Sequence, residues 1–508
     1  MKTQSRVVGI GLSYLTTLVR TLSKLLLTPL YIKLLGLDDY GLYQYVFSVA
    51  SYATILDFGI SSVVNTFAIK NREEGNIKGV ENVMFYAFVF SLGAALLIVL
   101  AGLVIIIGAP FIFGEAVQQR LGVARIMLAI IITELIFLMF QHYFEGVILA
   151  AEKYVTLRAV ALVQILIRCI ITVLLLYSHV GVLAIAIGDC VGISLCLLFE
   201  IYFCKAKLGL VIKYHYRDKE LIAGIAKLSS ALCLQSVVSY LNSSIDMYVL
   251  GRFLDTVATA IYSVAITFSL FFDEIPTAIQ RLYLPQVVKL VTAKADGEAL
   301  TDFVIRPGRY QFMLVGGVLG GFILFGRQFI AMWTGEDTLI AWEIALLLMV
   351  PSVLPLIQNV CLSILTAMNK RMFRSYVLCA IAIANLFLTI FLVKKYGILG
   401  APIGTCVSLI LGNNIAMNWY YKKHIGINVK RLFLSIMKGI LPCAVVTTCA
   451  CAPLLLVQMS GWIWFFCEVI VFCLVYAVLL WFWGINSEEK SSIGAAFGKI
   501  RKKLGFSR

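Results

Sequence analysis

Charged side chains are scarce in this sequence. Only 14% of its 508 residues are Asp, Glu, Lys or Arg, whereas 61% are hydrophobic, and the mean hydropathy is +0.95. A soluble protein needs roughly 25% charged residues to cover its surface. The shortage therefore excludes the two or three soluble domains that the length alone would allow.

The sequence also lacks the residue patterns of several kinds of site. Its 13 cysteines lie mostly inside apolar runs, where Cys is a small packing residue, and no pair has zinc-ligand spacing with a nearby His. No nucleophile elbow, metalloprotease helix, phosphate loop or dinucleotide fingerprint occurs in its required context. We therefore expect no metal site, no cofactor and no enzymatic activity.

Apolar runs long enough to cross a membrane recur along the whole chain. A span of about 20 apolar residues crosses a hydrocarbon layer, and these runs are too long for barrel strands. We predict an all-α polytopic membrane protein with about 14 transmembrane helices, near residues 7–35, 40–67, 82–107, 121–149, 157–177, 181–203, 221–250, 257–284, 310–333, 340–368, 375–393, 399–421, 436–457 and 462–484.

The net charge of +15 follows the predicted topology. With both termini in the cytoplasm, most Lys and Arg residues fall in the inner loops and tails, and the outer loops hold Arg120, Arg252, Lys394 and Lys395. This asymmetry is the positive-inside rule. It predicts a multi-pass protein of the cell membrane and no nucleic-acid partner.

The sequence contains an internal repeat. At an offset of 217 residues Tyr31 meets Tyr248, Asp57 meets Glu274 and Gln141 meets Gln358. At an offset of 216, Gly181–Val191 matches Gly397–Val407 at six of eleven positions. We predict two tandem six-helix lobes of one orientation, with a linker, a helix pair and a basic amphipathic tail: residues 1–204 (N-lobe), 205–220 (basic inner linker), 221–421 (C-lobe), 436–484 (helices 13 and 14) and 487–508 (tail, or a partly ordered basic segment).

Several cations lie inside the predicted spans. Arg20 and Lys24 share one face of the first helix with Thr17, Thr21 and Thr28. Ionisable groups in spans usually face a cavity or a partner, and such cations suit a phosphate or diphosphate. The candidate substrate-binding residues are Arg20, Lys24, Arg168, Lys227 and Arg281. Alternatively, each cation neutralises a carboxylate, and Lys227 and Arg281 could extend to the membrane surface.

Acidic groups and one His form a second set in the spans. The candidates for coupling to an ion gradient are Asp57, Glu134, His142, Glu145 and Glu274. Structural pairing, such as Glu134 with Arg168, is the alternative for each.

The opening of the chain resembles a known family. Thr28-Pro29-Leu30, Leu35-Gly36, Asp39-Tyr40-Gly41-Leu42-Tyr43 and Asp57-Phe58-Gly59-Ile60-Ser61-Ser62 are similar to the polysaccharide-export branch of the multidrug/oligosaccharidyl-lipid/polysaccharide exporter superfamily, the Wzx-type flippases. The resemblance implies twelve core helices in two lobes, and essential cations on the first helix, which Arg20 and Lys24 match by position.

The resemblance also implies a function. The expected activity is translocation of a polyprenyl-diphosphate-linked oligosaccharide across the cytoplasmic membrane by alternating access. A multidrug cation antiporter of the same fold and a membrane-embedded glycan polymerase or ligase are the alternatives. The expected partners are the lipid-linked glycan and membrane lipids, with an envelope glycan polymerase as a further candidate, and the chain is expected to be a monomer.

Overall fold

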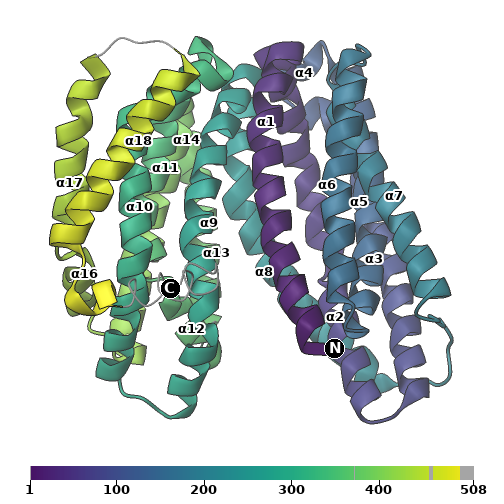
Figure 1. The fold of residues 1–508 in the computed structure, drawn as a ribbon. Helices are drawn as coiled ribbons and strands as arrows, with labels where there is room; N and C mark the ends of the chain where they lie inside the picture. The colour runs from purple at the N-terminus through teal and green to yellow at the C-terminus, as the bar shows by residue number, and fades with distance from the viewer. Residues whose placement is uncertain (1, 371, 457–460, 492–508) are drawn as a thin grey trace, which may run out of the picture. The chain divides into compact units, whose positions relative to one another are not determined.

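The computed structural model describes residues 2–370, 372–456 and 461–491. Every element assigned within these ranges is helical, so the predicted all-α class is confirmed. The helices fall into two compact units. Unit 1 comprises residues 1–263 with 385–401, and unit 2 comprises 264–384 with 402–508 (Figure 1). The predicted lobe boundaries at 204 and 221 stay a prediction.

Ten helical stretches of the described chain are long and apolar enough to cross a membrane, or eleven if one bent pair counts as a span. Two of them, residues 11–73 and 372–425, are 63 and 54 residues long. A single crossing needs only about 20 residues, so each of these stretches has the length for two. The polytopic fold is confirmed, and the count of fourteen stays a prediction.

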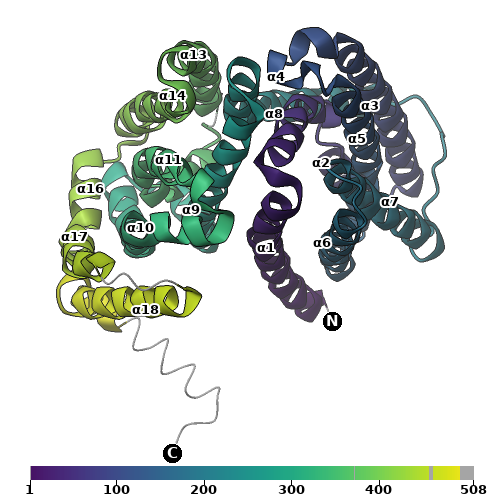
Figure 2. The same ribbon diagram turned by 90° about the horizontal axis from the view of Figure 1, so that it is seen from above.

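Unit 1 is a bundle of long helices around an apolar core. Viewed from above, α5 lies beside α2 and α7, and α1 lies beside α6 (Figure 2). The elements are α1 (Lys2–Ala50), η1 (Ser51–Asp57), α2 (Ile60–Glu73), α3 (Ile77–Ile112), α4 (Glu115–Gln118), α5 (Leu121–Ala150), α6 (Tyr154–Tyr177), α7 (Leu183–Ala206) and α8 (Lys219–Phe253).

The predicted span 40–67 is wrong as one continuous helix. α1 ends at Ala50, a 3₁₀ turn follows to Asp57, and Phe58 and Gly59 adopt left-handed φ angles of 51° and 64° before α2 begins. Two successive left-handed residues interrupt the hydrogen-bond ladder of a right-handed helix. α1 itself changes direction at Gly36, whose φ of 84° favours glycine.

Unit 2 continues from α9 and contains most of the remaining helices. The elements are α9 (Thr256–Thr292, which begins in unit 1), α10 (Gly297–Thr334), η2 (Glu336–Thr338), α11 (Ile340–Ile357), α12 (Val360–Ala367), α13 (Met372–Tyr396, which ends in unit 1), η3 (Gly397–Leu399, in unit 1), α14 (Gly400–Leu409, which begins in unit 1), η4 (Ile410–Ala416), α15 (Met417–Tyr420), η5 (Tyr421–Ile425), α16 (Val429–Met437), α17 (Ile440–Cys451), η6 (Ala452–Leu456), α18 (Trp462–Leu479) and η7 (Leu480–Gly484).

Two expectations for this half need correction. The loop expected between 284 and 310 is mostly helical, because α9 reaches Thr292 and Asp296 caps α10 by accepting a hydrogen bond from the Ala299 N–H at 2.8 Å. The span 340–368 is broken between α11 and α12. The predicted span 436–457 corresponds to α17 and η6, and the bend of 42° between α16 and α17, where Gly439 has a φ of 80°, lies at its beginning.

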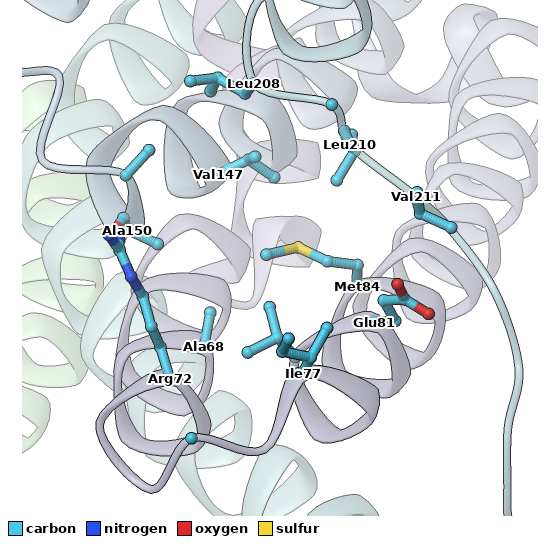
Figure 3. A pocket seen from close by; sticks show the side chains of 14 residues that line it. Ala68, Arg72, Ile77, Glu81, Met84, Val147, Ala150, Leu208, Leu210 and Val211 are labelled. Carbon is cyan, nitrogen blue, oxygen red and sulfur yellow. The ribbon is translucent and has the colours of Figure 1, made fainter.

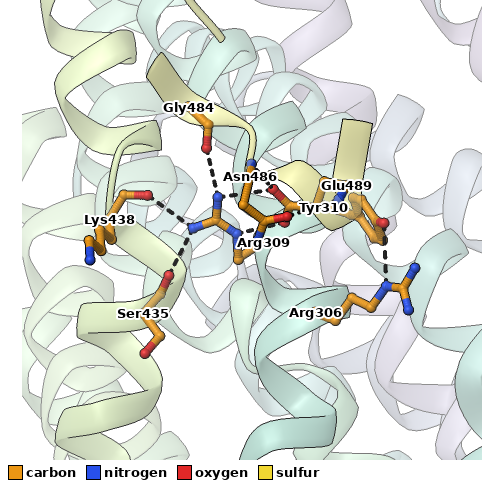
Figure 4. Close-up of polar contacts among 8 residues, drawn as sticks. All are labelled: Arg306, Arg309, Tyr310, Ser435, Lys438, Gly484, Asn486 and Glu489. Carbon is orange, nitrogen blue, oxygen red and sulfur yellow. Dashed lines mark hydrogen bonds and ion pairs between the residues drawn. The ribbon is translucent and has the colours of Figure 1, made fainter. Parts of the chain in front are cut away.

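One buried arginine joins α10 to the end of the described chain (Figure 4). The Arg309 guanidinium donates to the Ser435 and Lys438 carbonyls, each at 2.9 Å, and to the Gly484 carbonyl at 2.7 Å. It also pairs with Glu489 at 2.6 Å. The last carbonyls of a helix lack partners inside the helix, so Arg309 caps α16 and η7 together. The basic tail predicted for 487–508 lies outside the described residues from 492 onward.

Candidate functional site

A cavity of about 460 Å³ lies inside unit 1, between α1, α5, α6 and α7. Six of the residues predicted from the sequence line it: Arg20, Lys24, Glu134, His142, Glu145 and Arg168. The sequence predicts the cations and the acidic groups as separate sets. The structure brings them together on one surface, which we call the charged cavity.

α1 supplies two of the three cations of the charged cavity. Arg20 and Lys24 are four residues apart, and side chains at this spacing share a helix face. The hydroxyls beside them are bonded to the backbone: Ser23 donates to the Arg20 carbonyl and Thr28 to the Lys24 carbonyl, each at 2.8 Å. Within the described part of the chain, neither Arg20 nor Lys24 forms an ion pair. Both charges remain available to a ligand.

Arg168 on α6 has a protein partner. Its Nε forms an ion pair with Asp189 on α7, and the Tyr43 hydroxyl donates to the second oxygen of Asp189 at 3.1 Å. The pairing of Arg168 with Glu134 that the sequence suggested is therefore wrong. Glu134 still interacts electrostatically with both Arg168 and Asp189. The pairing reduces the positive charge that Arg168 can offer to a ligand.

The acidic side of the charged cavity is built on α5. His142 Nδ1 lies 2.9 Å from Asp57 Oδ1 in η1, which places Asp57 behind His142. Glu145 interacts electrostatically with His142 and, across the cavity, with Arg20. The arrangement places a protonatable ring between a carboxylate and the cavity.

Sequence reasoning missed Glu200 on α7. Its side chain is fully buried, its Oε1 accepts a hydrogen bond from Gln141 Nε2 at 3.4 Å, and no described residue donates to its Oε2. The same Gln141 amide donates to Gln164 Oε1 at 3.0 Å. The signal that could have found Glu200 is a carboxylate inside the predicted span 181–203, which also contains Asp189.

The lining of the charged cavity is balanced in formal charge. Three cations face three carboxylates, Glu134, Glu145 and Asp189. Asp189 and Arg168 neutralise each other. The net charge of the other lining residues therefore depends on whether Glu134 and Glu145 carry protons. With both protonated, Arg20 and Lys24 leave an excess of two positive charges.

Unit 1 also contains a cavity of about 320 Å³ with a mainly apolar lining (Figure 3). Its two charged side chains, Arg72 and Glu81, both have protein partners. Arg72 Nη1 donates to the Ala150 carbonyl at 3.2 Å, and Glu81 pairs with His215 at 2.5 Å. The side chains drawn between Arg72 and Glu81 are apolar, among them Ile77 and Met84. This cavity therefore has fewer free positive charges for binding an anion than the charged cavity has.

The other predicted residues are not among those that line the charged cavity. Lys227 is exposed on α8 of unit 1 and does not line it. Arg281 and Glu274 are exposed on α9 in unit 2. No group of three or more His, Cys, Asp or Glu side chains that could hold a metal ion occurs among the described residues.

Comparison with known sequences places residues 7–285 within a family model described as polysaccharide biosynthesis protein. The uncharacterized membrane protein EpsK of Bacillus subtilis (strain 168) is 24% identical over 498 residues, which cover 94% of each chain. A Shigella flexneri protein provisionally named an O-antigen transporter is 22% identical over 406 residues, or 77% of this chain and 91% of its own.

Solved structures share the fold. The lipid II flippase MurJ in an inward closed conformation superposes with a TM-score of 0.73 at 17% identity, covering 93% of this chain and 98% of its own. An inward-facing multidrug resistance transporter of the MATE family superposes with a TM-score of 0.64 at 13% identity, covering 84% of this chain and 98% of its own.

Proposed function

Because the chain belongs to the polysaccharide biosynthesis protein family, we propose that it is a flippase that moves a polyprenyl-diphosphate-linked oligosaccharide across the cytoplasmic membrane. In this proposal the diphosphate binds Arg20 and Lys24 in the charged cavity. The polyprenyl chain stays in the lipid, since an isoprenoid gains nothing by leaving an apolar solvent. Alternating access then exposes the cavity to each side of the membrane in turn.

The observation that carries this proposal is the pair of unpaired cations on α1. An ionisable group in a membrane span is unfavourable unless it has a partner or faces water. Neither Arg20 nor Lys24 has an ion pair among the described residues, and both face the same 460 Å³ cavity. Arg binds phosphate oxygens through two parallel hydrogen bonds and Lys binds them as a point charge. Two such groups one helical turn apart suit an anion with two phosphates.

Binding of farnesyl diphosphate to the purified full-length chain in nanodiscs tests this assignment. A hydrogen bond to a charged group contributes about 1.5–3 kcal/mol, so Arg20→Ala or Lys24→Ala should weaken binding roughly 10- to 150-fold. Arg20→Lys should have a smaller effect because it keeps the charge and loses the bidentate geometry. Lys33→Ala, which removes an exposed cation of the same helix, is the matched control. Unchanged affinity in the Arg20→Ala/Lys24→Ala double variant would disprove the assignment.

A multidrug cation antiporter is the second candidate, and the three carboxylates of the charged cavity favour it. The fold does not separate the two functions, because both solved structures superpose. Competition does. If tetraphenylphosphonium binds in the cavity and Glu134→Gln or Glu145→Gln abolishes that binding, while farnesyl diphosphate does not bind, the antiporter is the better assignment. Chemical change of a lipid-linked sugar by the purified chain would instead support the polymerase or ligase alternative.

A further inference from the structure

Unit 2 contains a polar cavity of its own, of about 190 Å³, between α9, α11, α13 and the helices from α14 to η5. Its lining is rich in amide and hydroxyl groups: Ser352, Gln358, Asn359, Asn413 and Tyr421. We call it the amide cavity. Asp273 and Arg374 add one charge of each sign.

The charged cavity and the amide cavity occupy equivalent places in the sequence repeat. Leu138, Gln141, His142 and Glu145 line the charged cavity, and the residues 217 positions later, Pro355, Gln358, Asn359 and Leu362, line the amide cavity. At the offset of 216, Ile193 of the first corresponds to Leu409 of the second. The repeat has therefore placed a polar cavity at the same position in each unit.

The side chains at these equivalent positions differ in chemistry. His142 corresponds to Asn359 and Glu145 to Leu362. Beyond the π-helical segment 410–416, whose wider turns accommodate one extra residue, the offset returns to 217 and the buried Glu200 corresponds to Met417. Each change replaces an ionisable group by an amide or an apolar group. The amide cavity thus keeps donors and acceptors in place and loses most groups that could bind an anion or a proton.

Two buried oxygens of the amide cavity accept no hydrogen bond from a described residue. Gln358 is only 2% exposed, and no described residue donates to its Oε1. The same holds for Asp273 Oδ1. A buried acceptor without a donor is unfavourable by about 1–3 kcal/mol, so native structures usually satisfy such groups with a ligand or water. Both oxygens require donors, which a fully deprotonated anion such as diphosphate cannot supply.

The helices around the amide cavity are locally irregular. Pro355 has no N–H, which frees the Pro351 carbonyl, and Asn414 Nδ2 donates to that carbonyl at 3.2 Å. Asn413 and Asn414 lie in the π-helical segment Ile410–Ala416. Such segments are rare and occur frequently at functional sites. Here Asn413 lines the cavity while Asn414 anchors the π-helix to α11.

We infer that the amide cavity binds a sugar ring through its hydroxyl groups. A sugar hydroxyl both donates and accepts, so it satisfies the Gln358 and Asp273 oxygens and can accept from the amides of Asn359 and Asn413. The inference rests on the proposed function, in which the substrate carries an oligosaccharide. It assigns sugar recognition to unit 2 and diphosphate recognition to unit 1.

Saturation-transfer NMR on the full-length chain in nanodiscs tests the inference, with the methyl glycosides of glucose, galactose and N-acetylglucosamine as probes. We expect at least one glycoside to give a signal that persists in excess pyrophosphate. The Gln358→Met/Asn359→Leu double variant should bind that glycoside at least about fivefold more weakly, because each neutral hydrogen bond is worth roughly a factor of five. Asn413→Leu, at a half-buried position, should have the same direction of effect.

Matched controls separate binding from folding and from the proposed function. Gln311→Met removes a fully buried amide of unit 2 that lies outside the cavity and donates to the Pro276 carbonyl at 3.0 Å, so it should leave the glycoside signal unchanged. Arg20→Ala/Lys24→Ala should abolish farnesyl diphosphate binding and keep the glycoside signal. The inference would be overturned if none of the three glycosides gave a signal. It would also be overturned if the signal survived both the double variant and Asn413→Leu. Neither result bears on the diphosphate assignment, which the farnesyl diphosphate experiment tests separately.

Discussion

At the scale of single residues, Arg168 and Arg20 show how similar side chains take different roles. Arg168 reaches an aspartate that also accepts a hydrogen bond from Tyr43, so its charge is held by the protein. Arg20 has no such partner within the described structure. The first stabilises the wall of the charged cavity, and the second is available to a ligand.

Removing Asp189 should destabilise unit 1 more than removing the whole pair. Asp189→Ala leaves Arg168 without its counter-ion, which is unfavourable by about 3–5 kcal/mol for a fully buried pair. The effect should lie at the lower end of that range because the Arg168 side chain is 41% exposed. Thermal unfolding in detergent measures it.

The Asp189→Ala/Arg168→Leu double variant is the control, and it should recover part of the lost stability because no unpaired cation remains. An Asp189→Ala variant as stable as the wild type would show that the ion pair is not structural.

At the scale of elements, α5 carries two of the three carboxylates of the charged cavity, Glu134 and Glu145, on one face. Glu134, Gln141 and Glu145 recur at spacings of seven and four residues, which correspond to about two turns and one turn. The cavity separates this face from Arg20 and Lys24 of α1. Ionised Glu145 attracts Arg20 and competes with an anionic ligand for it. Proton binding and diphosphate binding should therefore favour one another, as linkage requires.

The affinity for farnesyl diphosphate should rise as the pH falls into the range in which Glu145 binds a proton. Protonation of Glu145 removes the competing charge, and one coupled proton changes the affinity by up to about tenfold per pH unit. Glu145→Gln should bind more tightly than the wild type at pH values above that range and show a flatter pH profile. Isothermal titration calorimetry at each pH measures both.

Glu73→Gln, an exposed change on α2, controls for titration of the ligand itself. Parallel profiles for the wild type and both Glu134→Gln and Glu145→Gln would exclude these carboxylates from coupling.

Another contact at the element scale is the cap that Arg309 of α10 places on α16 and η7. The Arg309 and Glu489 side chains are 8% and 3% exposed. Glu489→Ala should lower the stability of unit 2 by about 3–5 kcal/mol, because it leaves the buried guanidinium without its counter-ion. Thermal unfolding tests this, with Glu336→Ala, an exposed change in η2 of unit 2, as the control. Equal melting temperatures for the two variants would contradict the role assigned to the pair.

At the scale of the whole molecule, the distribution of charge along the chain predicts how it lies in the membrane. Cysteines introduced at both termini, Lys213 and Lys430 should react only from the cytoplasmic side, and those at Glu115 and Lys395 only from the outside. A membrane-impermeant maleimide on intact cells measures this. Labelling of the C-terminus from outside, with the N-terminus reacting only from inside, would exclude an even number of crossings and with it the count of fourteen.

Properties set by local periodicity follow from the sequence alone. Helical class follows from long apolar runs, and the shared face of Arg20 and Lys24 follows from the pitch of one helix. The family-level resemblance, carried by residues 1–75, is confirmed by the match over 7–285. The equivalence of positions 217 residues apart also follows from the sequence, because a repeat preserves order along the chain.

Contacts between distant segments are decided only by the tertiary structure. Arg168 has several carboxylates within reach by sequence, and only the packing of α6 against α7 selects Asp189 over Glu134. The helix break at Phe58 and Gly59 has no proline beside it that would have predicted it from the sequence. The meeting of the cations of α1 with the acidic groups of α5 depends on helices separated by about a hundred residues. Helix packing determines which side chains meet, since the surface of each helix is compatible with several neighbouring helices.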